Sequence, residues 1–138
     1  MMITALIAAV LFDNVSADKS DDQFTQLPNF TEPMRTNSYS GYLDVNVNKS
    51  LHYVFIESED DPANDPVLIW FNGGPGCSSL LGFLQENGPI VVDDDNMTTY
   101  MNPHPWNQRA NTLYLESPAG VGFSFAANNE SMVHSDVS

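Results

Sequence analysis

A short apolar run that ends in a glycine-rich turn constrains the fold of this chain more than any other feature. Residues 67–71 are Val-Leu-Ile-Trp-Phe, and the turn at 72–79 follows at once as Asn-Gly-Gly-Pro-Gly-Cys-Ser-Ser. An apolar run without alternation predicts a strand covered on both faces, as in a parallel sheet. A helix is expected at 80–84, because Ser78 or Ser79 can cap it. A buried strand that feeds such a turn presents backbone N–H groups at the sheet edge, where they can hold an oxyanion.

Other segments extend this pattern into an α/β arrangement. Residues 40–45 alternate toward a strand, and 51–56 are rich in aromatic and β-branched residues. The turn-like stretch 46–50 joins them, which predicts an antiparallel hairpin. A further short apolar strand is expected at 112–115. Strand–helix–strand order with intervening loops is the signature of an α/β fold, so the chain is expected to form an incomplete α/β sheet.

Composition limits the classes of partner. The 138 residues include 18 acidic and 4 basic side chains, a net charge of −14. Nucleic acid and anionic membrane surfaces are therefore poor partners. One cysteine and no paired histidine spacing argue against a metal site. The glycine-rich turn lacks the Gly-x-x-x-x-Gly-Lys of a phosphate-binding loop, and no cofactor is expected.

Residues 1–17 are predicted to be a signal peptide. The stretch 3–12 is apolar, and Val-Ser-Ala at 15–17 gives a small-x-small cleavage pattern. The alternative is a buried strand or helix of the domain, since the run is too short to span a membrane. Residues 18–138 would then form the rest of the chain.

Asn-x-Ser/Thr sequences support the secretory pathway. A glycan attached to Asn14 would leave with the signal peptide. Four further sites lie in polar, turn-like surroundings where a glycan can be accommodated. These predicted glycosylation sites are Asn29, Asn48, Asn96 and Asn129. Together with the signal-like start, they favour secretion or delivery to a lysosome or vacuole.

The glycine-rich turn is the strongest candidate for chemistry. Gly73 and Gly74 let the chain adopt tight or left-handed conformations and let a substrate approach the backbone. An ordinary strand-to-helix turn needs only two glycines, so Gly-Gly-Pro-Gly is more than such a turn requires. The sequence therefore favours a functional loop here.

Several motifs, in the same order, make the chain resemble the N-terminal part of the serine carboxypeptidases. The resemblance covers about residues 24–126. It implies the α/β-hydrolase fold and the removal of single residues from peptide C-termini, by acyl transfer through a Ser–His–Asp triad. The motifs are residues 70–79, 86–89, 102–103, 106–107, Asn111 and 116–124.

The resemblance implies roles for four residues around the turn. The Gly74 N–H would be one of two oxyanion donors. Asn72 and the Gly73 N–H would bind the C-terminal carboxylate of the peptide substrate. Trp70 would support this network.

The resemblance also implies roles for Glu86 and Cys77. Glu86 would join the carboxylate-binding group, with a second glutamate that precedes the nucleophile in the family. A carboxyl group facing a carboxylate must carry or share a proton to donate a hydrogen bond, which favours binding at acidic pH. Taken alone, Glu86 is expected to be a solvated residue at a helix end. Cys77 taken alone could be a buried apolar residue, a free thiol or half of a bridge; the resemblance implies a disulfide with a cysteine far downstream.

The catalytic triad of the family has no match in this sequence. The family's nucleophile lies in a Gly-Glu-Ser-Tyr-Ala-Gly elbow, and Gly-Phe-Ser-Phe-Ala at 122–126 comes nearest. It has alanine where glycine is needed, so Ser124 is not expected to be the nucleophile. His52 is expected to face out of the hairpin, His104 is held between prolines, and His134 lies in the tail.

The sequence therefore predicts a truncated N-terminal fragment of a serine carboxypeptidase, inactive by itself. It is also expected to leave a sheet edge uncovered. Two alternatives stay open. The complete protein could be an acyltransferase on the same scaffold, since an alcohol can replace water in the same chemistry. The chain could also be a secreted, non-catalytic peptide-binding protein.

Overall fold

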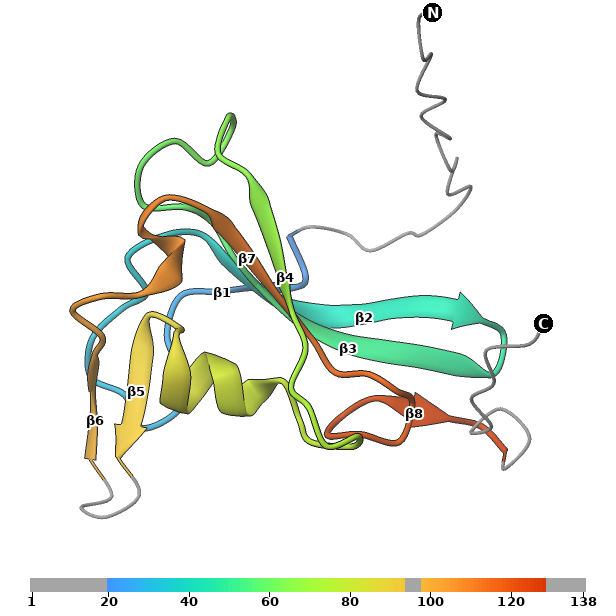
Figure 1. Cartoon of the computed structure of the whole chain (residues 1–138). Helices are drawn as coiled ribbons and strands as arrows, with labels where there is room; N and C mark the ends of the chain where they lie inside the picture. Colours follow the sequence, from blue (N-terminus) through green and yellow to red (C-terminus); the bar gives the residue numbers. More distant parts are fainter. Residues whose placement is uncertain (1–19, 94–97, 129–138) are drawn as a thin grey trace, which may run out of the picture.

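The computed structural model describes residues 20–93 and 98–128, which form two sheets and two short helical segments (Figure 1). The larger sheet has the strand order β1-β2-β3-β7-β4, and β8 also pairs with β3. Its strands are β1 (Gln23–Phe24), β2 (Ser38–Asn46), β3 (Lys49–Ile56), β4 (Val67–Trp70), β7 (Asn111–Leu115) and β8 (Phe125–Ala126). The other elements are β5 (Ile90–Asp93), β6 (Thr98–Met101) and the helical segments η1 (Gly82–Glu86) and η2 (Trp106–Gln108).

The predicted hairpin is confirmed as β2 and β3. The two strands pair antiparallel, with Tyr42 opposite His52, and a β-bulge lies between Asp44 and Asn46. Residues along β3 alternate between half-buried and buried from Lys49 to Ile56. Because side chains alternate along a strand, one face of β3 carries its buried residues.

The apolar run at 67–71 forms β4, which pairs in parallel with β7. The parallel pairing fits the sequence, but the expected cover on both faces is wrong for the described residues. Val67 is 59% exposed and Ile69 is 55% exposed. The reason is position: β4 is the last strand on its side of the sheet, and the connection from β4 to β7, whose described part holds η1, β5, β6 and η2, leaves it exposed.

The expected helix after the turn also forms. Its π-helical part is η1, where the Asn87 N–H donates to the Gly82 carbonyl at 2.9 Å. Gly82 is required because a Cβ atom there would lie 2.2 Å from the Trp70 indole nitrogen. The helical segment therefore packs directly against the end of β4.

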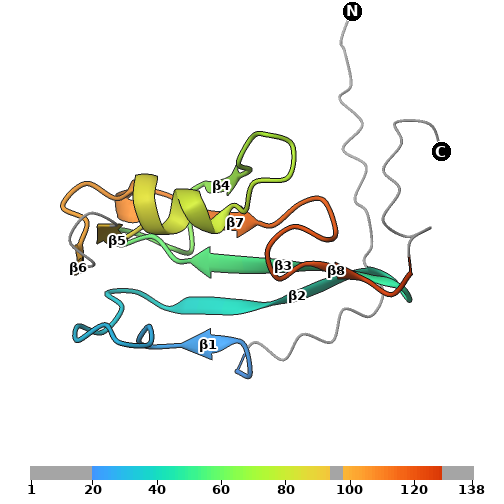
Figure 2. The ribbon, with the colours of Figure 1, turned by 90° about the horizontal axis from the view of Figure 1, so that it is seen from below.

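The core lies between the larger sheet and η1 (Figure 2). Val54, Ile56, Phe83 and Tyr114 are its buried members, and the rings of Phe83 and Tyr114 are 5.3 Å apart. The Tyr114 hydroxyl donates to Asn87 Oδ1 at 2.9 Å. Burial raises the pKa of Tyr114 to about 12. The core thus ties β3 and β7 to the segment that follows the glycine-rich turn.

Three predictions concern residues outside the described ranges. They are the signal peptide at 1–17 and the glycosylation sites Asn96 and Asn129. His134 also lies outside these ranges. In the part of the chain that is described, no helix is long and apolar enough to cross a membrane.

Candidate functional site

Two loops meet at one edge of the larger sheet. The glycine-rich turn at 72–79 leaves the carboxyl end of β4, and the loop at 116–124 leaves the carboxyl end of β7. Since β4 and β7 are parallel neighbours, both loops start from the same edge (Figure 1). In open α/β sheets, binding sites lie outside the carboxyl ends of the strands.

The backbone of the turn uses its glycines as the sequence predicts. Gly74 has φ +131° and Gly76 has φ +101°, values that side-chain-bearing residues rarely adopt. The Cys77 N–H donates to the Gly73 carbonyl at 3.3 Å and closes the turn. Gly73 and Gly74 are exposed, so an incoming group can approach their backbone.

Trp70, Asn72 and Glu86 form one hydrogen-bonded group beside the turn. The Trp70 indole N–H donates to Asn72 Oδ1 at 2.6 Å, and Gly82 N–H donates to the same oxygen at 3.2 Å. Asn72 Nδ2 then donates to Glu86 Oε1 at 3.3 Å. The structure therefore brings together the three side chains that the resemblance selects. The Asn72 amide is held by two donors on its oxygen, which points its NH₂ group toward Glu86.

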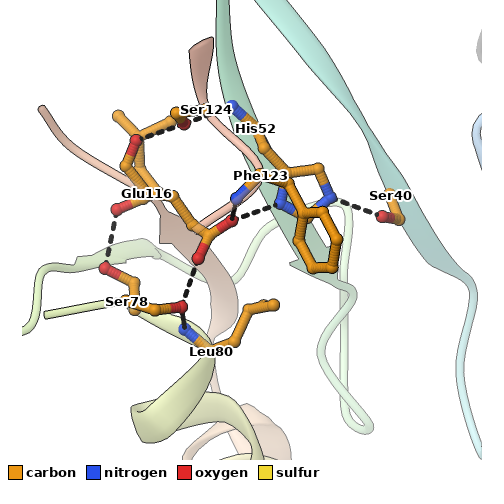
Figure 3. A network of polar contacts seen from close by, with 9 residues as sticks. Ser40, His52, Ser78, Leu80, Glu116, Phe123 and Ser124 are labelled. Atoms are coloured by element: carbon orange, nitrogen blue, oxygen red, sulfur yellow. Dashed lines mark hydrogen bonds and ion pairs between the residues drawn. The ribbon is translucent and has the colours of Figure 1, made fainter. Parts of the chain in front are cut away.

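Glu116, which no sequence argument selected for a role, lies at the centre of a second network (Figure 3). It directly follows β7, and the residue is 0% exposed. Its Oε1 accepts from the Ser78 hydroxyl. Its Oε2 lies 3.0 Å from His52 Nδ1 and accepts from the Phe123 N–H at 2.8 Å. Both carboxyl oxygens are thus satisfied by groups from three segments.

His52 does not face out of the hairpin, so that prediction is wrong. The residue is 7% exposed, because position 52 falls on the buried face of β3 with Ser50, Val54 and Ile56. An ionised carboxylate only accepts hydrogen bonds, so in the tautomer that bonds to an ionised Glu116 the ring proton of His52 is on Nδ1. Alternation along β3 was a usable signal for this placement.

Ser124 is buried and serves the same network. Its hydroxyl donates to the Glu116 carbonyl at 2.6 Å and accepts from the His52 N–H at 2.8 Å. The bond from the His52 N–H joins the loop at 116–124 to β3, and the bond to the Glu116 carbonyl links the two ends of that loop. The expectation that Ser124 is not the nucleophile stays a prediction.

Ser40, His52 and Glu116 are aligned like a nucleophile, base and acid. The Ser40 hydroxyl lies 3.0 Å from His52 Nε2. The Ser40 N–H donates to the Asp22 carbonyl at 2.8 Å. These contacts make Ser40 a support of the His52 ring from β2, and the expectation that this chain holds no nucleophile stays a prediction.

A cavity of about 710 Å³ borders Ser40 and His52. Most of its lining is apolar, with Phe24, Phe83 and Ile90 among the side chains that contribute. None of the turn residues 72–79 lines it. The cavity is therefore separate from the group formed by Trp70, Asn72 and Glu86.

The remaining candidate residues have simple surroundings. Cys77 is an exposed thiol that has no disulfide partner in the described residues. Asn29 and Asn48 are exposed, Asn29 with φ +61° and Asn48 in the turn between β2 and β3. His104 is also exposed. Among residues 20–93 and 98–128, no cluster of His, Cys, Asp or Glu is arranged to hold a metal ion.

Comparison with known proteins agrees with this geometry. The family model described as serine carboxypeptidase matches residues 28–138. The mouse lysosomal protective protein is 49% identical over 110 residues, which cover 80% of this chain and 23% of the relative. Serine carboxypeptidase-like 20 of Arabidopsis thaliana is 38% identical over 99% of this chain and 29% of the relative.

A solved structure gives the fold. The prohormone-processing carboxypeptidase Kex1(delta)p of Saccharomyces cerevisiae superposes with a TM-score of 0.55 and 31% identity. The match covers 65% of this chain and 21% of that chain. The two sheets and their loops are thus part of an α/β-hydrolase fold. This chain belongs to the serine carboxypeptidase family. It spans between 23% and 29% of the length of the two curated relatives described above.

Proposed function

We propose that this chain supplies one wall of a serine carboxypeptidase active site, which releases C-terminal residues from peptides. The observation that carries the proposal is the hydrogen-bonded group of Trp70, Asn72 and Glu86 beside the exposed Gly73 and Gly74. The Asn72 amide and the Glu86 carboxyl group lie beside the exposed backbone of the turn. This combination of hydrogen-bonding groups suits a ligand that ends in a carboxylate.

In this proposal the substrate's carboxylate binds to Asn72 Nδ2, the Gly73 N–H and Glu86. Glu86 carries or shares a proton when it faces the carboxylate, because two ionised carboxylates repel one another. Binding is therefore favoured in acidic surroundings. Trp70 orients Asn72 by its bond to Oδ1.

The Gly74 N–H in this proposal stabilises the oxyanion of the tetrahedral intermediate. A serine nucleophile with its histidine and aspartate partners, as in the Ser–His–Asp mechanism, would act from elsewhere in the folded enzyme. One lost oxyanion donor costs about 10²–10³ in kcat in hydrolases of known mechanism. Gly74 would therefore act on the transition state, while the carboxylate group acts on substrate binding.

Calorimetric titration at pH 5 tests the carboxylate site directly. N-acetyl-phenylalanine and its C-terminal amide are each titrated into the 138-residue chain. The acid is expected to bind more tightly than the amide, by about tenfold, since one charge-assisted hydrogen bond carries about 1.5–3 kcal/mol. Equal affinities, or no binding of either, would remove the proposal.

Two variants refine the titration. Glu86→Ala and Asn72→Ala should each reduce the preference for the acid over the amide. Asn64→Ala is the matched control, because Asn64 is an exposed asparagine that donates to Asp61 Oδ2 at 2.8 Å, away from the turn. It should leave the preference unchanged.

We also propose that the protein enters the secretory pathway and reaches a lysosome, a vacuole or the exterior. The support is the signal-like sequence at 1–17, the acidic composition and the similarity to a relative named for the lysosome. Expression in eukaryotic cells followed by deglycosylation tests this. Loss of apparent mass on deglycosylation, reduced by Asn29→Gln or Asn48→Gln, is expected. A chain of unchanged mass would contradict it.

A further inference from the structure

We propose that Glu116, held by His52, is a positioning residue that sets the shape of the glycine-rich turn. The inference rests on the proposed function, because that function gives the turn its role. Its own evidence is a chain of contacts that runs from the buried carboxylate to the turn.

The link to the turn passes through Ser78. The Ser78 hydroxyl donates to Glu116 Oε1 and accepts from the Leu80 N–H at 3.2 Å. It therefore joins the last part of the turn both to the carboxylate and to the start of the helical segment. Figure 3 shows Ser78 between Glu116 and Leu80.

A second link lies beside it. The Ser79 hydroxyl donates to the Leu115 carbonyl at 2.6 Å and accepts from the Asn72 N–H at 3.3 Å. Ser78 thus joins the end of the turn to the Glu116 carboxylate. Ser79 joins Asn72, the first residue of the turn, to β7. Gly73 and Gly74 lie between Asn72 and Ser78 in the sequence. The positions of these two bonded residues therefore determine the directions of the Gly73 and Gly74 N–H groups.

Glu116 in turn is fixed from the opposite side. His52 Nδ1 lies 3.0 Å from Glu116 Oε2, and the backbone carbonyl of His52 accepts from the Glu116 N–H at 3.0 Å. His52 Nε2 contacts the Ser40 hydroxyl at 3.0 Å, which holds the ring in place from β2. The carboxylate therefore cannot shift without breaking its contact to β3, and the ring that makes this contact is itself held from β2.

Stability alone does not explain a charged group at this position. A buried ion pair is often no more stabilising than apolar side chains of the same volume. Glu116 instead accepts hydrogen bonds from groups on three separate segments: β3, the turn and the loop at 116–124. Accepting directed bonds from three segments fixes their relative placement, which apolar contacts do not.

Hydrogen exchange followed by NMR on the 138-residue chain tests this role without any peptide ligand. Ser78→Ala removes the link to the turn and leaves Glu116 with His52. The amides of Cys77 and Leu80 are expected to exchange about tenfold faster, as local opening becomes easier. The Gly74 amide resonance should shift, while amides in β3 and β7 keep their exchange rates.

The controls separate positioning from a general loss of stability. Ser78→Thr keeps a hydroxyl and should restore slow exchange. Ser50→Ala removes a hydroxyl that donates to Asp44 at 2.6 Å in the hairpin and should leave the turn unaffected. The inference is overturned if Ser78→Ala leaves exchange and the Gly74 resonance unchanged, or if every amide in the chain exchanges faster to the same degree. Neither result depends on carboxylate binding, so the proposed function can fail separately.

Discussion

His52 Nδ1 lies 3.0 Å from Glu116 Oε2, and both residues are buried although their positions are 64 residues apart. This pair joins β3 to the carboxyl end of β7. It is the shared support of the two loops that start from that edge of the sheet.

The first prediction concerns this pair. His52→Ala leaves the Glu116 carboxylate buried without one of its donors. The free energy of unfolding should fall by about 3–5 kcal/mol, the usual cost of breaking a buried pair. Urea denaturation measures the change. Thr99→Ala, at an exposed position of β6, is a surface control that should cost less than about 0.5 kcal/mol; a similar cost for both variants would contradict the assignment.

The second prediction concerns alkaline pH. Burial raises the pKa of Tyr114 from 10.0 to about 12. The neutral form is favoured in the folded state, so this contribution is complete below pH 10 and is lost as pH rises through 12. A shift of this size corresponds to about 3 kcal/mol.

The measurement is urea denaturation at pH 9 and pH 11.5. The chain with Tyr114→Phe should lose less stability between the two pH values than the unchanged chain. Tyr42→Phe is the matched control, since Tyr42 is 43% exposed. If all three proteins lose the same stability between the two pH values, the ionisation of Tyr114 does not contribute to the pH dependence of folding.

The third prediction concerns Gly122, which has φ +53° and lies against the Glu116 carboxylate. An added Cβ would overlap Oε1, at 1.8 Å. Gly122→Ala combines backbone strain with this overlap and should cost about 3–5 kcal/mol. Gly76→Ala has strain alone, because nothing lies within 4 Å of its Cβ position. It should cost about 1–2 kcal/mol, and thermal melting curves of the two variants decide the order.

The fourth prediction concerns the exposed apolar strand β4. Edge strands with apolar side chains tend to pair with further copies. The chain is expected to self-associate at micromolar concentrations, and Ile69→Lys should reduce the average mass seen by light scattering. Val47→Lys adds the same charge at a residue that is 98% exposed in the hairpin turn. If both variants act equally, net charge and not the β4 edge controls association.

The hairpin and the carboxyl-end turn were predictable because they depend on local chemistry. Alternation over residues 40–45 predicted β2, aromatic and β-branched residues predicted β3, and a continuous apolar run followed by glycines predicted β4 and its turn. The group of Trp70, Asn72 and Glu86 came from the family resemblance. Trp70 and Asn72 lie on β4 and its turn, and η1 then carries Glu86 toward them.

The role of Glu116 was not predictable in the same way. Its partners His52, Ser78 and Phe123 are separated along the sequence and meet only when β3, β4 and β7 assemble. The sequence around a single acidic residue that follows a strand does not indicate that the residue is buried. The exposure of β4 was not predicted either. An apolar run indicates that a strand is stabilised by burial, but it does not identify the segment that would bury it.

The parallel pairing of β4 with β7 has a consequence for synthesis on the ribosome. The turn at 72–79 is made well before β7, so at first it has neither the strand beside it nor the carboxylate behind Ser78. Contacts between distant residues form late, because the intervening chain must close first. The turn therefore takes its final shape only after residue 116 has left the exit tunnel. Until then, the glycine-rich segment lacks the contacts that fix it in the folded chain.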